Sequence, residues 1–179
     1  MNFSLNSLYE QPFTVLNGLS QVQGSPLSDP SVIVRDGARK LYTWWADYVA
    51  RHDKLPTRNS FDILTMLPHA ANMFLAARLP DGGWTYQLQG EDFKRLFNGG
   101  FQSNEAINRS FAAFTQPVSE YLDSVAAART CHRNFGKVSV GVQKRNTFEA
   151  IDCPLIDAGG SVSHMIGIAE LFRGANAQS

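Results

Sequence analysis

Apolar residues recur at helical spacing after a turn-rich beginning, and then alternate with polar residues in several short runs. The helical positions are Ala38, Leu41, Trp45 and Tyr48. Ser28-Asp29-Pro30 before them has the form of a helix start with proline in the first turn. Leu55-Pro56 ends the pattern, because proline disfavours the helical conformation of the residue before it. The spacing predicts an amphipathic leading helix over residues 29–54.

A β-hairpin is predicted from residues 70–79 and 83–89, which flank Asp81-Gly82. These two residues tolerate the positive φ angles that a two-residue turn requires. With such a turn, Leu79 pairs with Trp84, and alternation places one set of side chains on the core face. That set is Met73, Leu75, Ala77, Trp84, Tyr86 and Leu88.

The rest of the chain predicts a helical middle followed by three strands. Residues 91–97 and about 104–127 have helical spacing, which Pro117 interrupts. Strands are predicted at about 129–135, 146–156 and 163–172, with Asp152 on a polar strand face. The order is a helix, two strands, helices and three strands, which predicts an α+β fold.

This order resembles that of a PAS domain, in which helices lie across one face of a five-stranded antiparallel sheet. Short motifs narrow the resemblance to a family of stand-alone bacterial PAS-type proteins. In chain order they are Tyr42-Thr43-Trp44-Trp45, Leu55-Pro56-Thr57-Arg58, Phe61-Asp62-Ile63, Met66-Leu67-Pro68, the hairpin end Trp84 to Gly90, and Cys153-Pro154-Leu155. The resemblance covers about residues 36–173. It implies a sensory or regulatory module, usually dimeric, without shared catalytic residues or a particular ligand.

On this interpretation the chain has four parts: an N-terminal extension, a leading helix, a PAS-like domain and a tail. Their bounds are residues 1–28, 29–54, 55–173 and 174–179. One domain is expected, because 179 residues with 44% hydrophobic content suffice for one core but not for two. The extension is predicted to stay mobile or to pack on a partner.

Charge and cysteine content exclude several classes of protein. Sixteen Lys+Arg balance sixteen Asp+Glu, so the chain lacks the basic field that polyanion binding requires. No basic residue precedes Arg35, and no apolar run reaches the length of a membrane span. A cytoplasmic protein without a nucleic-acid partner is therefore predicted. Cys131 and Cys153 fit no disulfide or metal pattern and are expected to be buried thiols.

Signals for cofactors and catalysis are weak. Haem and zinc require ligands, and the histidines show no ligand spacing. They are His52, His69, His132 and His164. An adduct-forming flavin requires a cysteine in the helical middle, which has none, although flavin without an adduct stays open by this reasoning. Gly159-Gly160-Ser161 lacks the second glycine of a nucleophile elbow, and no phosphate loop is present. The sequence predicts no metal, haem, flavin or enzymatic activity.

An apolar cavity between the sheet and the helical middle is the leading hypothesis for a site, and a filled core is the alternative. Its candidate lining residues are Met73, Leu75, Tyr86, Leu88, Phe93, Phe97, Phe111, Phe114 and Met165. Small residues at Gly167 and Ala169 are expected to leave space. If the strand register shifts by one residue, polar anchors come from Asn72, Gln87, Gln89 or Arg58.

Aromatic residues around the leading helix indicate a second role. One sheet cannot cover aromatic side chains on more than one side of this helix, which predicts a homodimer or partner surface unless residues 1–28 cover them. The aromatic residues are Tyr42, Trp44, Trp45 and Tyr48. Two functions follow. The first is a sensory module that binds a small, largely apolar ligand and signals in trans. The second is a ligand-free module for dimerisation or for docking a signalling protein.

Overall fold

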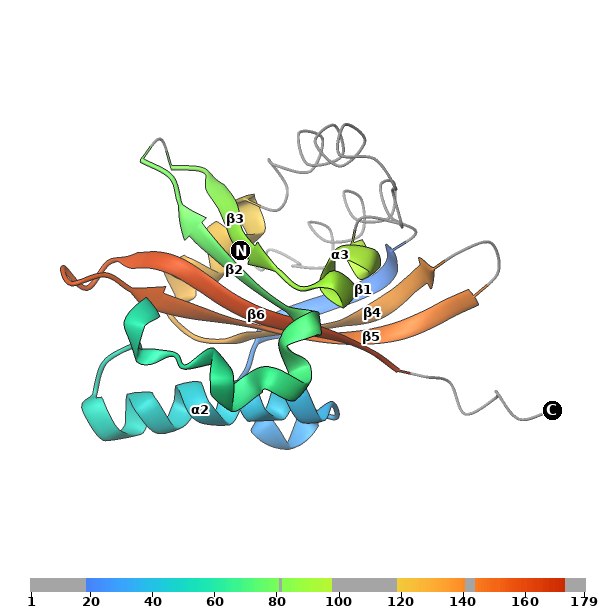
Figure 1. Ribbon diagram of the computed structural model, residues 1–179, viewed down its shortest axis with the longest axis horizontal. Helices are drawn as coiled ribbons and strands as arrows, with labels where there is room; N and C mark the ends of the chain where they lie inside the picture. The colour runs from blue at the N-terminus through green and yellow to red at the C-terminus, as the bar shows by residue number, and fades with distance from the viewer. Residues whose placement is uncertain (1–18, 81, 98–118, 141–143, 173–179) are drawn as a thin grey trace, which may run out of the picture.

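The computed structural model describes residues 19–80, 82–97, 119–140 and 144–172, which form a six-stranded antiparallel sheet with helices on both faces (Figure 1). The strands are β1 (Leu19–Pro26), β2 (Met73–Arg78), β3 (Trp84–Gln89), β4 (His132–Val140), β5 (Lys144–Ile156) and β6 (Val162–Phe172). Their order across the sheet is β1-β4-β5-β6-β2-β3. The α+β class is confirmed, but the sheet has six strands where five were expected.

The additional strand, β1, lies in the stretch assigned to the N-terminal extension. It pairs with β4 from Leu19 opposite Val138 to Pro26 opposite His132, with one irregularity between Ser20 and Gln23. Pairing with β4 covers an edge whose backbone N–H and C=O groups would otherwise lack partners. Because an edge strand is held by backbone hydrogen bonds, its sequence requires no strong apolar alternation.

Helices cover the two faces of the sheet. On one face lies α2 (Asp36–His52), preceded by the 3-10 helix η1 (Pro30–Val32) and followed by η2 (Arg58–Ser60) and η3 (Ile63–Asn72). On the other face lie α3 (Glu91–Phe97) and a helical segment over residues 119–128. From α2 onward the order is a helix, two strands, a helical stretch and three strands, as the PAS resemblance implies. Most of the predicted helix over 104–127 lies outside the described residues.

The leading helix begins later than predicted. The Asp29 carboxylate accepts a hydrogen bond from the Ser31 N–H (2.8 Å) and so caps η1, which is only three residues long. The chain is extended at Ile33, whose side chain is fully buried, and α2 starts at Asp36. The expected helix start is therefore a separate turn, because burial of Ile33 in the core interrupts the helix. The predicted end is confirmed, since Asp53 adopts the left-handed conformation (φ 51°) directly after α2.

The hairpin turn has three residues, where two were expected. The Leu79 N–H donates a hydrogen bond to the Gly83 carbonyl (2.6 Å), and the Gly82 N–H donates one to the Leu79 carbonyl (3.0 Å). Gly82 has a φ of 94°, which suits the left-handed position that ends such a loop. Arg78 consequently pairs with Trp84, so the predicted Leu79–Trp84 register is wrong by one residue.

An irregularity between Leu75 and Ala76 then changes the register again. Leu75 lies opposite Leu88, as predicted, but Tyr86 lies opposite Ala76. Since neighbouring residues of a strand point to opposite faces, Tyr86 is on the other face of the sheet from Leu75.

Candidate ligand-binding site

The hairpin register separates the predicted lining residues. Met73, Leu75 and Leu88 lie on the face that α2 covers. Tyr86, Phe93 and Met165 lie on the α3 side. There the rings of Tyr86 and Phe93 pack around the Phe74 ring, at centroid distances of 5.4 and 4.8 Å. Phe111, Phe114 and the Phe97 side chain lie outside the described residues. The predicted single set of residues therefore occupies two environments.

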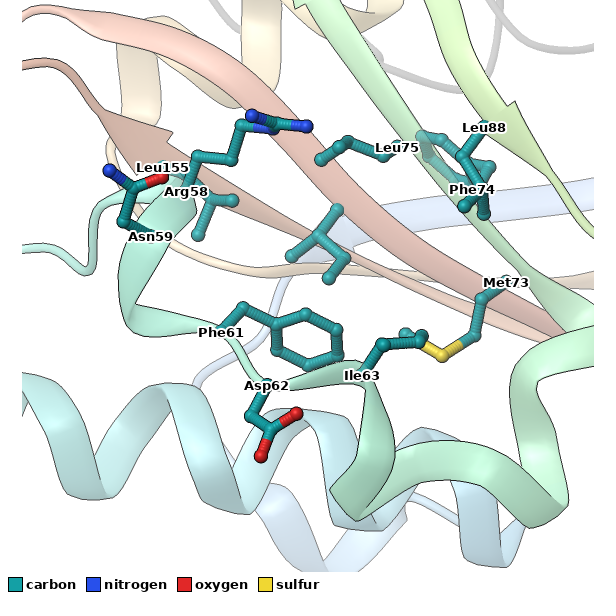
Figure 2. A pocket seen from close by; sticks show the side chains of 11 residues that line it. Arg58, Asn59, Phe61, Asp62, Ile63, Met73, Phe74, Leu75, Leu88 and Leu155 are labelled. Carbon is teal, nitrogen blue, oxygen red and sulfur yellow. The ribbon is translucent and has the colours of Figure 1, made fainter.

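A partly open pocket of about 570 Å³ lies on the α2 face, between the segment 58–63 and the sheet (Figure 2). Its lining is mostly apolar, and its volume is within the range of small-molecule sites. The lining residues are Arg58, Asn59, Phe61, Asp62, Ile63, Met73, Phe74, Leu75, Leu88, Leu155 and Ile166. Met73, Leu75 and Leu88 of the predicted lining residues contact this pocket, but the cavity was predicted between the sheet and the helical middle, which covers the other face (Figure 1). Arg58, named as a polar anchor for a register shifted by one residue, also lines the pocket.

The Leu55-Pro56-Thr57-Arg58 motif fixes one side of this pocket. Leu55 is buried, and the Pro56 carbonyl accepts a hydrogen bond from the Ile156 N–H (2.9 Å) at the end of β5. The Thr57 and Ser60 side chains then bond to each other (2.8 Å) in a capping box around η2. The motif thereby attaches η2 to the sheet and places Arg58 at the pocket.

Phe61 and Asp62 connect the pocket with neighbouring helices. The Phe61 ring packs edge-on against Trp44 of α2, with centroids 4.9 Å apart. The Asp62 carboxylate accepts a hydrogen bond from the Leu64 N–H (2.9 Å) and caps η3. One wall of the pocket is thus in direct contact with α2.

The aromatic residues of α2 have different environments. Trp45 is 6% exposed, and its indole N–H donates to the Pro154 carbonyl (2.9 Å). Tyr48 is half-buried, stacks on His52 and accepts a hydrogen bond from the Ser60 hydroxyl (3.2 Å). Tyr42 and Trp44 are half-buried and pack against the core. Trp45 is therefore a core residue, because the sheet and the segment 55–61 cover more than one side of the helix.

Two carboxylates of the sheet hold the first turn of α2. Glu149 of β5 accepts hydrogen bonds from the Val34 (3.0 Å) and Arg35 (2.6 Å) N–H groups and from the Arg133 guanidinium (2.6 Å). Glu170 of β6 accepts one from the Ala38 N–H (2.9 Å). These bonds join α2 to β5 and β6, two strands whose side chains also line the pocket.

A buried polar cluster lies on the α3 side of the sheet. The Asp152 carboxylate is 4% exposed and accepts hydrogen bonds from the Tyr121 hydroxyl and from the Asn134 amide (2.9 Å). Burial raises the pKa of Asp152 to about 7, while these two hydrogen bonds act to lower it. The expected polar strand face is therefore wrong for Asp152, because the segment 119–128 packs over it.

His132 lies opposite Asp152 in the β4–β5 pair and is also buried. Burial lowers the pKa of His132 to about 4, so the imidazole is neutral near pH 7. Among the described residues, neither of its ring nitrogens has a hydrogen-bond partner.

Gly167 does not create space in this region. A methyl group added at this residue would lie 2.5 Å from Asp152 Oδ1 and 2.6 Å from Phe74 Cζ. The Phe74 ring and the Asp152 carboxylate fill the space above Gly167, so the expected space at this position is wrong. Ala169 is likewise buried.

The other histidines that were considered as cofactor ligands have contacts with nearby side chains. His69 lies 3.4 Å from an Asp36 oxygen and 3.5 Å from a Glu170 oxygen, and His164 contacts the Ser163 hydroxyl. Within the described ranges, no three His, Cys, Asp or Glu side chains form a group that suits a metal ion. None of the helices described there is long and apolar enough to cross a membrane. The absence of haem and flavin stays a prediction.

The two cysteines, Cys131 and Cys153, are both free and buried, as expected. Burial raises the pKa of each thiol.

Comparisons with known proteins give little further information. No protein-family model matches the chain, and no curated protein matches it. The chain is similar to a solved structure described as that of an RNA-binding Light-Oxygen-Voltage receptor, with a TM-score of 0.43 and 17% sequence identity. The match covers 84% of this chain and 38% of that one.

Proposed function

We propose that this chain is a PAS-like sensory module that binds a small, largely apolar molecule between the segment 58–63 and the sheet. The observation that carries the proposal is the pocket of Figure 2, which is apolar along most of its lining. Pockets of this size and composition are typical of sites that hold small organic molecules. The module acts by binding, without catalysis, in the cytoplasm, and without haem, flavin or nucleic acid as a partner.

Two contacts support transmission from the pocket to α2. Phe61 lines the pocket and touches Trp44 of α2, so a ligand that displaces the Phe61 ring also changes the packing of that helix. Leu155 and Ile166 line the pocket from β5 and β6, the strands that hold the first turn of α2. We propose that α2 carries the change to a second copy of the chain or to a separate signalling protein.

Binding of Nile red, a neutral and apolar fluorescent dye, tests the proposed function. The purified chain is expected to bind the dye with an increase in fluorescence. Leu75→Trp fills the pocket and is expected to abolish binding, whereas Leu75→Ala enlarges the pocket and retains it. Leu79→Trp, the same change at an exposed turn position outside the pocket, is the matched control. Equal dye binding by folded Leu75→Trp and the unaltered chain would contradict the proposal.

A ligand-free interaction module is the second candidate, and three exposed leucines favour it. Leu64 and Leu67 of η3 are 66% and 58% exposed, and Leu88 at the pocket is 47% exposed. Large apolar side chains left exposed in this way are available for contacts with another protein. Light scattering of the chain and of a Leu64→Gln, Leu67→Gln variant tests this candidate. A dimer that the double substitution converts to a monomer supports it, and an unchanged mass contradicts it.

A further inference from the structure

Among the described residues that line the pocket of Figure 2, Arg58 is the only cationic one. Its side chain is exposed, and within the described part of the chain its guanidinium forms neither a hydrogen bond nor an ion pair. Figure 2 shows the side chain extending from η2 toward Leu75, above the apolar lining. An arginine without partners beside an apolar surface provides a planar set of donors that matches a carboxylate.

The other polar groups nearby do not neutralise this guanidinium. Asp62 also lines the pocket, but its carboxylate bonds to the Leu64 N–H and lies, in Figure 2, on the side of the chain turned to α2. His164 has its pKa lowered, first by burial and then by the charge of Arg58, so it is neutral near pH 7. Asp157 acts on His164 in the opposite direction and is not among the lining residues.

We propose that the pocket selects a small monocarboxylate with an apolar body, whose carboxylate pairs with Arg58 while its hydrocarbon part contacts the apolar lining. This inference rests on the proposed function and adds the chemical class of the ligand to it. A purely apolar pocket would prefer a neutral compound, because removing a carboxylate from water is costly without a charged partner. The guanidinium reverses that preference.

Octanoate and octanol distinguish a pocket that prefers carboxylates from one that prefers neutral compounds. The two molecules have hydrocarbon tails of the same length and differ in the head group. Each is titrated directly by calorimetry and against bound Nile red. For the unaltered chain, octanoate is expected to bind about twofold to fivefold more tightly than octanol, which is the gain that an ion pair with an exposed arginine provides. Added salt is expected to weaken octanoate binding and to leave octanol binding unchanged.

Arg58→Gln removes the charge from an exposed side chain that bonds to no other described residue, so the fold is expected to persist. In this variant the preference for octanoate is expected to disappear, while Nile red and octanol bind as before. Arg95→Gln is the matched control, because Arg95 is an exposed residue of α3 on the other face of the sheet. It is expected to leave all three affinities unchanged.

The outcomes distinguish this inference from the proposed function. If octanol binds as tightly as octanoate, or if Arg58→Gln leaves octanoate binding unchanged, the pocket binds apolar molecules but the carboxylate inference is wrong. If neither Nile red nor either titrant binds, both the inference and the proposed function are wrong. A loss of the octanoate preference confined to Arg58→Gln supports both.

Discussion

Glu149 and Glu170 lie directly opposite each other in β5 and β6, and both carboxylates accept hydrogen bonds from backbone N–H groups at the start of α2. Like charges opposite each other normally destabilise a sheet. Here the helix N-terminus and the Arg133 guanidinium compensate them, since the first N–H groups of a helix lack partners within the helix. Arg35, the residue before α2, provides no side-chain cap, so the sheet provides the cap.

Removing these carboxylates is expected to lower stability. Glu149→Ala removes the acceptor of two backbone N–H groups and leaves the half-buried Arg133 without its partner, and is expected to cost about 2–4 kcal/mol of unfolding free energy. Glu170→Ala removes one cap and is expected to cost about 1–2 kcal/mol. The exposed Glu91→Ala control is expected to change it by less than about 0.5 kcal/mol. Urea unfolding measures all three, and a Glu149→Ala variant as stable as the control would contradict this account.

The raised pKa of Asp152 predicts that stability falls as the pH rises from about 4 to about 7. In the folded chain its pKa is raised to about 7 from an ordinary 3.8, so the folded state holds this proton more strongly than the unfolded state. The contribution is complete below about pH 4 and is lost as the pH rises to about 7, with a magnitude on the order of 4 kcal/mol. Asp152→Asn cannot ionise, so its unfolding free energy is expected to rise relative to the unaltered chain over this interval. A constant difference between the two proteins would contradict the prediction.

The lowered pKa of His132 predicts the opposite dependence, in which stability falls as the pH is lowered. Its folded pKa is lowered to about 4 from 6.5, so the unfolded chain binds the proton first and stability falls as the pH drops below about 6.5. His132→Phe keeps a ring without a titrating group and is expected to reduce that loss by about 2 kcal/mol at about pH 5. Thermal or urea unfolding of both proteins at about pH 5 and about pH 7 provides the comparison. If the substitution has the same effect at both values, His132 is not the titrating group.

Gly167→Ala is expected to destabilise the chain by about 1–3 kcal/mol, because the new methyl group overlaps Asp152 and the Phe74 ring. Adding Phe74→Leu makes space and is expected to recover part of that loss. Gly159→Ala is the control, since its nearest neighbour is an Asp157 oxygen at 3.3 Å in an exposed turn. Equal costs for the two alanine substitutions would show that the space above Gly167 is not filled as described.

Local sequence patterns predicted most elements of this chain. Alternation around Ile151, Cys153 and Leu155 indicated a strand, helical spacing from Ala38 to Tyr48 indicated α2, and Asp81-Gly82 indicated a turn. Each pattern depends on neighbours within a few residues, which the chain order alone specifies. The same patterns predicted a cavity on the side of the helical middle, whereas the pocket that Met73, Leu75 and Leu88 line is on the α2 face.

The remaining features of the fold and the pocket depend on contacts between segments that are far apart in the sequence. One extra residue in the hairpin loop moved Tyr86 to the other face from Leu75, because side chains in a strand alternate with a period of two. β1 joined the sheet through backbone hydrogen bonds, which leave little trace in side-chain pattern. The first turn of α2 is capped by Glu149 and Glu170, more than a hundred residues later in the chain. The pocket likewise combines segment 58–63 with β2, β3, β5 and β6, so its existence depends on packing that no local pattern specifies.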